Sequence, residues 1–356
     1  MSDGANGHVL AANLLLTDGA VTLNSASNDV DVVAASGVDS LTLVDADAVQ
    51  VGIVGANSGI ASSGAVSISG TDLTIAQAVS STSGSINLQA SGDTTLAASG
   101  SLTANASNIT LSTTEFFVAA GSGNGISTSA GNVSITFDAT GNASNTHMAF
   151  ANRGISATNI NLQARTAYNF MLGQKYNDTF GLSVNDVKGL QASNTLLLAD
   201  SGSGAGTLDI RSGFALAAGD LAGDLKLQYP TLYSNDNTSI ALSSGKTLTL
   251  QNTASSTLNG VIAGDTALVK LGSGTLSLAG SNTYTGTTTV SVGELRVGAG
   301  STSGSISADS AVAIANAATF AVNRSDAVSL ANNISGAGVL NKLGSNTLTL
   351  TGANTY

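Results

Sequence analysis

Short apolar–polar–apolar triplets, separated by small polar residues and glycine, recur along almost the whole chain. Typical examples are Val66-Ser67-Ile68, Ile86-Asn87-Leu88, Ile109-Thr110-Leu111, Leu248-Thr249-Leu250 and Leu276-Ser277-Leu278. Alternation with a period of two places the apolar side chains on one face of a strand and the polar ones on the other. The Ser-Gly, Asn-Gly and Gly-Asp pairs between triplets favour turns. The pattern therefore predicts an all-β protein with many short strands.

Internal repetition favours a parallel β-helix (solenoid) over a sandwich or a barrel. The pentapeptide INLQA occurs at 86–90 and again at 160–164, and the pattern of 63–69 returns at 83–89. The connectors are longer and more variable than the two-residue loops of antiparallel hairpins. Each turn of roughly 20–24 residues would contribute two or three strands. Inward Val, Leu and Ile would then stack as a core, and outward Thr, Ser and Asn as polar ladders. Each turn would depend on its neighbours for stability.

Two segments break this rhythm and are predicted to be lateral loop excursions, 144–190 and 226–237. The first concentrates basic and aromatic residues, and the second holds the only proline of the chain. They divide the chain into regular acidic turns at 1–143, a middle part with the excursions at 144–237, and a stem at 238–356.

Composition narrows the class of protein further. The chain has 356 residues, of which 42% are hydrophobic and 9% are charged, with 42 Gly and 1 Pro. A regularly placed apolar fraction of this size excludes a disordered linker, and the near absence of proline excludes collagen.

Charge is distributed unevenly. Residues 1–152 contain eleven acidic side chains and no Lys or Arg, so the formal net charge of −11 resides entirely in that part. An acidic surface repels nucleic acid and anionic lipid, so neither is expected as a partner.

Targeting signals and cysteine content give little information about where the protein is located. A signal peptide has a basic region followed by an apolar stretch. The first residues of the chain do not show this pattern. No apolar run is long enough for a membrane-spanning helix. The absence of cysteine fits a chain exported through an oxidising periplasm.

The stretch LVKLGSGTLSLAGSNTYTGTTTVSVGELRVGAG at 268–300 closely resembles the passenger-associated transport repeat, also called the autotransporter-associated β-strand repeat. The positions that fit the repeat are Lys270, Gly272, Gly274, Thr275, Leu276, Leu278, Gly280, Asn282, Tyr284, Gly286, Thr289, Gly293, Leu295 and Val297. A second copy fits at Lys342, Gly344, Thr347, Leu348, Leu350, Gly352, Asn354 and Tyr356, and departs from the repeat at Asn346. Eleven of fifteen positions are identical between 270–284 and 342–356. The repeat units are placed at 258–298 and at 334–356, the second one truncated.

This resemblance implies an autotransporter (type V secretion) passenger with a right-handed parallel β-helix, exported to the bacterial cell surface. In that family the repeats are implicated in secretion and folding of the passenger. The upstream part resembles filamentous haemagglutinin-like exoproteins and large adhesins. The chain is thus expected to be an internal piece of a longer protein, with more stem and a C-terminal outer-membrane barrel after Tyr356.

Candidate chemistry is sparse. The pairs Asp29 with Asp31 and Asp45 with Asp47 have a spacing that places both carboxylates on one strand face. They could form a hydrolytic pair or bind Ca²⁺, but Lys and Arg are absent nearby, and a solvated acidic face is the favoured interpretation. No catalytic residue, metal or cofactor is predicted.

The excursion at 144–190 supplies the candidate ligand-binding residues, Arg153, Arg165, Tyr168, Lys175 and Tyr176. Together they could present a basic, aromatic surface to an acidic glycan or a host or cell-surface protein. The alternative is a structural loop packed against the side of the coil.

The function expected from the sequence is a non-enzymatic structural stem of an exported adhesin or biofilm-associated autotransporter, located at the cell surface. Two alternatives remain. One is a polysaccharide-acting β-helix enzyme, and the other is a self-associating extracellular matrix or filament protein, in which exposed strand edges bind further copies.

Overall fold

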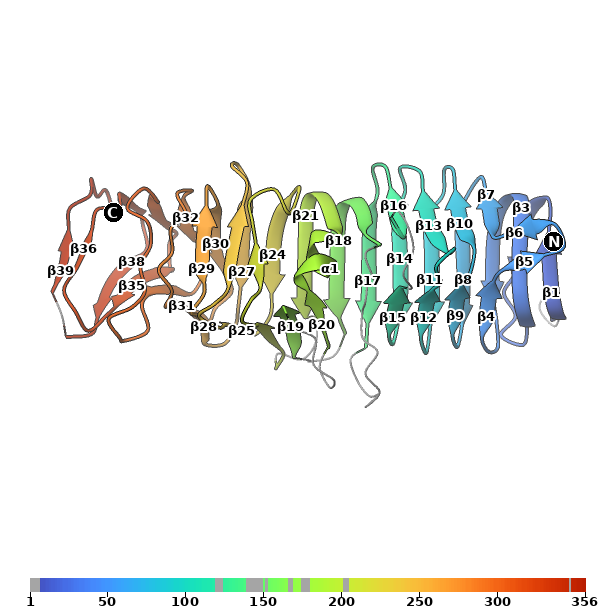
Figure 1. Cartoon of the computed structure of the whole chain (residues 1–356), viewed down its shortest axis with the longest axis horizontal. Coiled ribbons are helices and arrows are strands. Elements are labelled where there is room, and N and C mark those ends of the chain that lie inside the picture. Colours follow the sequence, from blue (N-terminus) through green and yellow to red (C-terminus); the bar gives the residue numbers. More distant parts are fainter. Residues whose placement is uncertain are drawn as a thin grey trace. The chain divides into compact units, whose positions relative to one another are not determined.

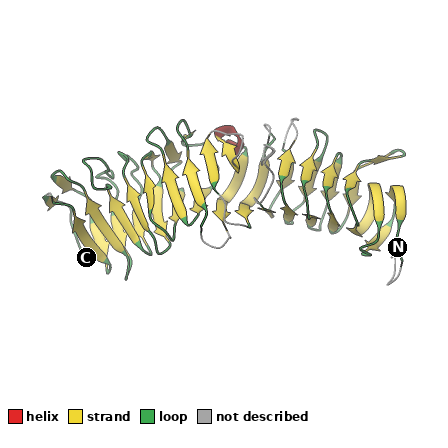
Figure 2. Ribbon diagram, turned by 90° about the horizontal axis from the view of Figure 1, so that it is seen from below, coloured by secondary structure: helices red, strands yellow, loops and turns green. Residues whose placement is uncertain are grey.

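The computed structural model describes residues 7–118, 124–138, 150, 153–165, 169–173, 180–200, 205–345 and 347–356. About 56% of the chain is strand, and parallel strands wind as a β-solenoid in each of the two units described below (Figure 1). Within the described residues there is a single helix, α1 (Val184–Lys188), shown in red in Figure 2. That helix is too short to cross a membrane. The predicted all-β parallel β-helix is confirmed.

The chain divides into two compact units. The first comprises Met1–Arg165 and Asn185–Asn194, and the second comprises Thr166–Val184 and Thr195–Tyr356. The three-part division predicted at 143 and 237 stays a prediction.

The first unit stacks its strands in three parallel ladders. The first ladder contains β2 (Gly19–Leu23), β3 (Asp29–Val44), β8 (Val66–Gly70), β11 (Ile86–Ala90), β14 (Ile109–Thr113), β17 (Asn132–Phe137) and β18 (Ile155–Ala164). The second contains β1 (Leu10–Leu16), β3, β4 (Val49–Val51), β9 (Leu73–Ile75), β12 (Thr94–Leu96) and β15 (Phe116–Val118). The third contains β3, β7 (Ile60–Ser62), β10 (Ala78–Ser81), β13 (Ser101–Ala104), β16 (Ile126–Thr128) and β18. Between β4 and β7 in the sequence, β5 (Ile53–Val54) and β6 (Asn57–Ser58) form a small antiparallel pair.

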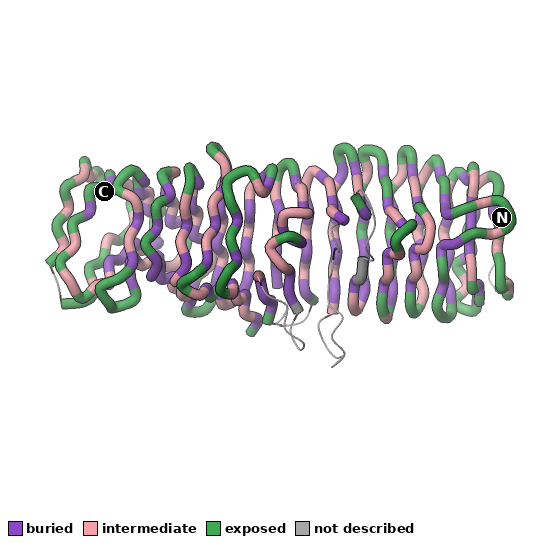
Figure 3. Tube along the Cα trace, viewed as in Figure 1, coloured by how far each residue is buried: buried purple, intermediate pink, exposed green. Residues whose placement is uncertain are grey.

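Strand register explains the triplets. Val66, Ile86, Ile109, Val133 and Ile160 are paired one above the next along the first ladder, and each is fully buried. Their neighbours in sequence point outward, so burial alternates along each strand (Figure 3). Equivalent residues are 20 apart at β8–β11 and 24 apart at β14–β17, as predicted, but 27 apart at β17–β18.

Asparagine forms the clearest polar ladder of this unit. The Asn108 Oδ1 atom accepts a hydrogen bond from the Asn132 amide at 2.9 Å. The Asn159 Nδ2 atom donates to Asn132 Oδ1 at 2.7 Å, and Asn194 Nδ2 donates to Asn159 Oδ1 at 2.8 Å. Stacked amides satisfy one another from turn to turn, as in other parallel in-register assemblies.

The second unit has the same organisation. Its first ladder contains residues 195–200 of β21 (Leu190–Asp200), then β24 (Asp224–Gln228), β27 (Thr247–Gln251), β30 (Ala267–Leu271), β32 (Thr288–Val290), β34 (Val312–Ile314) and β37 (Ile334–Gly336). Its second contains β20 (Phe180–Ser183), β19 (Phe170–Gly173), β22 (Thr207–Ile210), β25 (Thr231–Ser234), β28 (Ser256–Leu258), β31 (Thr275–Leu278), β33 (Glu294–Val297), β35 (Thr319–Asn323) and β38 (Val339–Leu343). The third side contains β23 (Ala215–Leu216), β26 (Ser239–Leu242) and β29 (Val261–Gly264), and further along β36 (Val328–Leu330) paired with β39 (Leu348–Leu350).

The excursion predicted at 226–237 is wrong. This segment contains most of β24 and β25, both paired with strands of neighbouring turns. Pro230 lies at the corner between them, where the ladder requires no N–H from it. Its carbonyl oxygen accepts from Thr253 N at 3.1 Å and Ala254 N at 2.9 Å. Tyr229 points inward and its ring lies 6.0 Å from that of Phe170.

The excursion predicted at 144–190 is not continuous either. It contains β18, which pairs with β17 over six residues, and the strands β19 and β20. Residues 144–149, 151–152, 166–168 and 174–179 lie outside the described part of the chain.

Candidate functional site

Two of the five predicted ligand-binding residues, Arg153 and Arg165, are described, whereas Tyr168, Lys175 and Tyr176 lie outside the described residues. Arg153 is only 3% exposed. Its guanidinium donates to Ala97 O at 2.8 Å and also to Gly100 O, and burial lowers its pKa. This side chain therefore joins turns inside the first unit and is not available at the surface.

Arg165 directly follows β18 and remains about one third exposed. Its NH1 group pairs with the Asp138 carboxylate at 3.1 Å, and its NH2 group donates to the Ser112 hydroxyl. Because Asp138 follows β17 and Ser112 lies in β14, the guanidinium reaches back over two turns of the first ladder.

A polar groove of about 490 Å³ lies beside Arg165. Its lining includes the hydroxyl and amide side chains of Ser69, Thr71, Gln89, Ser91 and Ser112, with Asp45 and Arg165 also contributing. These residues lie at or just after the ends of β3, β8, β11, β14 and β18, so the groove follows one corner of successive turns. Its lining can exchange hydrogen bonds with a hydroxyl-rich ligand, and its described side chains include no aromatic ring.

The two acidic pairs differ in structure. Asp29 and Asp31 both point outward from β3, which confirms the predicted shared face. For Asp45 and Asp47 that prediction is wrong, because β3 ends at Val44 and the pair occupies a turn. Asp45 is buried, and its carboxylate accepts from Val30 N at 2.9 Å and Asp47 N at 3.2 Å, whereas Asp47 is exposed. Asp45 thus caps a corner of the coil.

Burial raises the pKa of Asp45 from its ordinary value of 3.8 to about 6, and Asp47 adds to the rise against the lowering effect of the two backbone N–H groups. Asp93 behaves similarly. Burial raises its pKa, and the neighbouring Asp72 raises it further. Asp93 N donates to Asp72 Oδ1 at 2.7 Å, one turn away. Among the residues that the structure describes, no three acidic or histidine side chains converge to hold a metal ion.

We expect the chain to be more stable near pH 5 than near pH 7.5, by on the order of 1 kcal/mol. A carboxyl group with a raised pKa in the folded state stabilises the fold at low pH, and this contribution is lost as pH rises through about 6. Urea unfolding followed by circular dichroism at the two pH values measures the difference. Asp45→Asn should reduce it, and an unchanged difference in that variant would show that Asp45 is not the group responsible.

The first transport-repeat copy places a lysine in the core. Lys270 in β30 is completely buried. Its ammonium donates to the carbonyl oxygens of Leu271 at 2.7 Å, Gly272 at 2.8 Å and Val292 at 3.3 Å. Burial lowers its pKa to about 8. The side chain closes its own corner and binds the corner of the following turn, since Val292 lies in the short connection between β32 and β33.

Asn282 joins three successive turns. Its Oδ1 atom accepts from Ile262 N at 2.8 Å in the preceding turn. Its Nδ2 atom donates to Gly280 O at 3.0 Å in its own turn and to Ser305 O at 2.9 Å in the next. The side chain is 3% exposed, so each of these bonds forms away from solvent and fixes the register of the turns.

Tyr284 completes the repeat with a buried chain of hydroxyl groups. Its OH lies 2.7 Å from Thr288 Oγ1, which lies 2.8 Å from Ser310 Oγ in the next turn. Burial raises the pKa of Tyr284 to about 12, so the phenol stays protonated at neutral pH. The repeat positions thus supply a polar network inside the core.

The second copy has the same local geometry but fewer contacts. Asn354 accepts from Ile334 N at 3.0 Å and donates to Gly352 O at 3.1 Å, which matches the first two bonds of Asn282. Lys342 donates to Gly344 O at 2.9 Å. Tyr356 is 54% exposed, whereas Tyr284 is fully buried. In the first copy, the bond from Lys270 to Val292 O and the bond from Asn282 to Ser305 O are both made to the following turn.

Sequence reasoning missed several buried asparagines outside the repeat. Asn28, Asn252 and Asn332 are at most 1% exposed. Asn252 Nδ2 donates to Ala254 O at 2.6 Å and Thr275 O at 2.9 Å. Asn252 and Asn332 each stand two residues after the last leucine of a strand, a signal that could have identified them as corner residues.

Comparison with known proteins agrees with these features. A family model of the passenger-associated transport repeat matches residues 268–297 and 340–356. The adhesin BmaC autotransporter of Brucella suis biovar 1 (strain 1330) is 40% identical over 92 residues, which is 25% of this chain and 3% of the adhesin. The chain therefore spans only a small part of the length of this relative. No solved structure matches the chain.

Proposed function

We propose that this chain, an autotransporter passenger with transport repeats, serves as a structural β-solenoid stem at the bacterial cell surface for adhesion or biofilm formation. We also propose that the repeats couple folding of the passenger to its secretion through the outer membrane. A stem needs rigidity, and the parallel ladders stacked over an apolar core provide it within each unit. The role is structural and not catalytic.

The observation that carries the secretion proposal is the bonding of Asn282 to three consecutive turns. A turn that has already formed outside the cell offers Asn282 and Lys270 as acceptors and donors for the backbone of the adjoining turn. Each turn thereby selects the correct register of its neighbour. Folding of the exported part then opposes backward movement of the chain.

We expect Asn282→Ala in the intact passenger to reduce the amount displayed on the cell surface by about threefold or more, because register selection and stability fall together. The matched control is Asn237→Ala, which removes an exposed side chain of the same unit. Surface labelling with an antibody measures display, and proteolysis of the purified chain measures stability. If the variant is less stable but is displayed at the normal level, the repeat does not couple folding to secretion through Asn282.

For adhesion, we propose that the polar groove beside Arg165 binds a glycan or a cell-surface protein. The support is that Arg165, one of the predicted ligand-binding residues, lines this groove. Tyr168, Lys175 and Tyr176 are proposed as further contacts. Unchanged adhesion by Arg165→Ala would remove this site from consideration.

The alternative functions have weaker support. A polysaccharide-acting enzyme would need a carboxyl group with a raised pKa that can reach its substrate. Asp45 has the most raised pKa, but its oxygens already accept hydrogen bonds from Val30 N and Asp47 N. For a self-associating matrix protein, the support is exposed apolar side chains on the last strands, with Val339 54% exposed. A chain that stays monomeric at high concentration by light scattering would exclude the matrix role.

A further inference from the structure

One side of the second unit contains a break in strand pairing. On this side Ser281 bridges Ser305 in parallel, and further along β36 pairs with β39. Between these pairs, segment 304–308 faces segment 327–331, and no backbone hydrogen bond joins the two in this fully described region. On the other two sides the strands that flank these segments pair directly, β33 with β35 before them and β34 with β37 after them. We call the space between the two segments the ladder gap.

Both edges of the ladder gap present unpaired backbone groups. Ser305 uses its N–H and C=O toward the preceding turn, where it bonds Gly280 O and Asn282 N. The adjacent residue, Ile306, therefore directs its N–H and C=O toward the gap, since these groups alternate in direction along a strand. On the opposite edge Val328 and Leu330 bond to β39, which leaves the N–H and C=O of Ser329 facing the gap.

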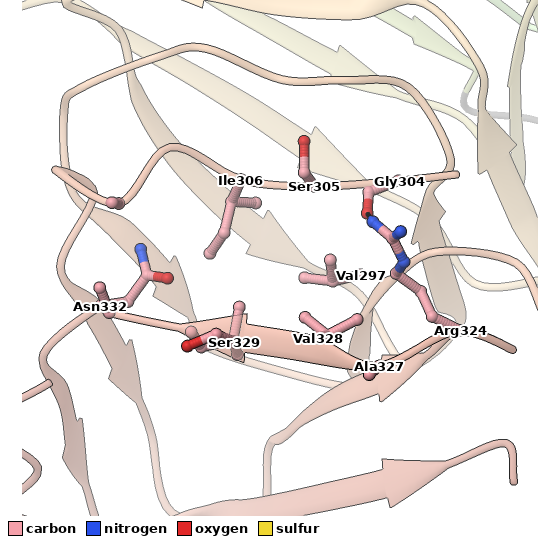
Figure 4. Close-up of a pocket in the computed structure, with 12 residues that line it drawn as sticks. Val297, Gly304, Ser305, Ile306, Arg324, Ala327, Val328, Ser329 and Asn332 are labelled. Carbon is pink, nitrogen blue, oxygen red and sulfur yellow. Dashed lines mark hydrogen bonds between the residues drawn. The ribbon is translucent and has the colours of Figure 1, made fainter. Parts of the chain in front are cut away.

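Side chains hold the ladder gap at its two ends. At one end, Arg324 donates to Gly304 O at 2.7 Å, and its charge is balanced by Asp326 at 2.6 Å. At the other end, Asn332 donates to Ser307 O at 2.6 Å and Ser310 O at 2.8 Å. Side-chain links take the place of the short backbone bonds of a ladder, and the pocket between the two segments has a volume of about 270 Å³ (Figure 4).

The lining defines the chemistry of an occupant. Val297, Ile306, Val328 and Leu330 supply apolar side chains to the pocket, while Ser305 and Ser329 supply polar groups. Arg324 is the only charged residue of the lining, and Asp326 balances it. The complement is an uncharged extended segment with backbone N–H and C=O groups on both edges and an apolar side chain directed inward.

We propose that the ladder gap binds a short extended peptide segment of a partner protein, which inserts as an additional strand between Ile306 and Ser329. Main-chain hydrogen bonds on both edges would provide the affinity, as in other cases of strand addition. The polar–apolar–polar alternation found throughout this chain is the pattern that fits. A second copy of this chain is a poorer source, because the described strands already pair within the coil.

The test uses the full chain and a fluorescein-labelled peptide with the sequence TSIALS, which is that of residues 238–243 and includes β26 from the same side of the coil. Fluorescence anisotropy should show saturable binding at one site per chain. Ser329→Pro removes the N–H that faces the gap and should weaken binding by about tenfold or more. Ser329→Ala keeps this N–H and should bind like the unaltered chain. Both variants should melt normally, because Ser329 is exposed and proline is tolerated where no ladder bond is lost.

Three results would overturn the proposal. Absence of saturable binding would show that the gap does not accept a strand. Equal binding by Ser329→Pro would place the peptide at another strand edge, such as that of β39. Dimerisation without peptide that the peptide competes away would assign the gap to a second copy of this chain. The secretion and stem roles are not at stake in this experiment, since neither requires an open gap.

Discussion

Replacing Gly272 with alanine should lower the free energy of unfolding by about 2–4 kcal/mol more than replacing Gly245 with alanine. Both glycines have left-handed backbones, with φ of 79° and 75°, so the cost of forcing an L-residue into this region, about 1–2 kcal/mol, is common to both. The difference is space. A β-carbon at Gly272 would lie 2.1 Å from the carbonyl oxygen of Asn252, whereas at Gly245 it would meet nothing within 4 Å.

The neighbour of Gly272 has little freedom to move. Asn252 is fully buried, and its side chain is bonded to the backbone at both Ala254 and Thr275. Chemical unfolding of the two variants under identical conditions measures the difference. Equal losses would mean that the corner relaxes by shifting Asn252, and the repeat glycine would then be required for its backbone angle alone.

Replacing Lys270 with methionine should cost about 2–3 kcal/mol, because the carbonyl oxygens of Leu271, Gly272 and Val292 would lose their common donor. Burial of the ammonium group is itself unfavourable, as its lowered pKa indicates. This cost opposes the stabilisation that the three hydrogen bonds provide. Buried charges of this kind can be replaced by apolar residues at no net cost when they are poorly bonded. Three acceptors argue that Lys270 is well bonded.

The matched control is Lys246→Met, at a half-exposed lysine in the same unit. Urea unfolding of both variants measures the contrast, and the control should stay within about 0.5 kcal/mol of the unaltered chain. A Lys270→Met variant as stable as the control would mean that desolvation cancels the three hydrogen bonds, and that the lysine of the repeat is present for another reason.

The alternation of apolar and polar residues was sufficient to predict the parallel coil, because a two-residue period and a stacked repeat are both visible in one sequence. INLQA at 86–90 and at 160–164 lies in β11 and β18, two strands of the same ladder. Composition was a poorer guide. The only proline and two nearby tyrosines made 226–237 look like a loop, but Pro230 fits a corner and Tyr229 fits the core.

Side-chain chemistry was harder to predict than the strands. Spacing alone placed Asp45 and Asp47 on one face, but a strand that ends at Val44 cannot impose its alternation on them. Arg153 and Arg165 are both basic residues of the same sequence segment and could not be distinguished there. In the structure Arg153 is buried and bonded to backbone carbonyl groups, whereas Arg165 lines a groove. Whether such a side chain is buried or exposed depends on the geometry of the corner where it lies. That geometry depends on residues one turn away, which are about 20 positions distant in sequence.

The glycine corners of the second unit differ in how much variation in length they can accept. Gly272 and Gly280 are enclosed by the backbone of the preceding turn, so an extra residue there would disturb the register on which Asn282 depends. Gly213, Gly219 and Gly245 face open space. Epitopes, tags or whole foreign domains inserted at these three corners should therefore be carried on the outside of the coil without altering its winding.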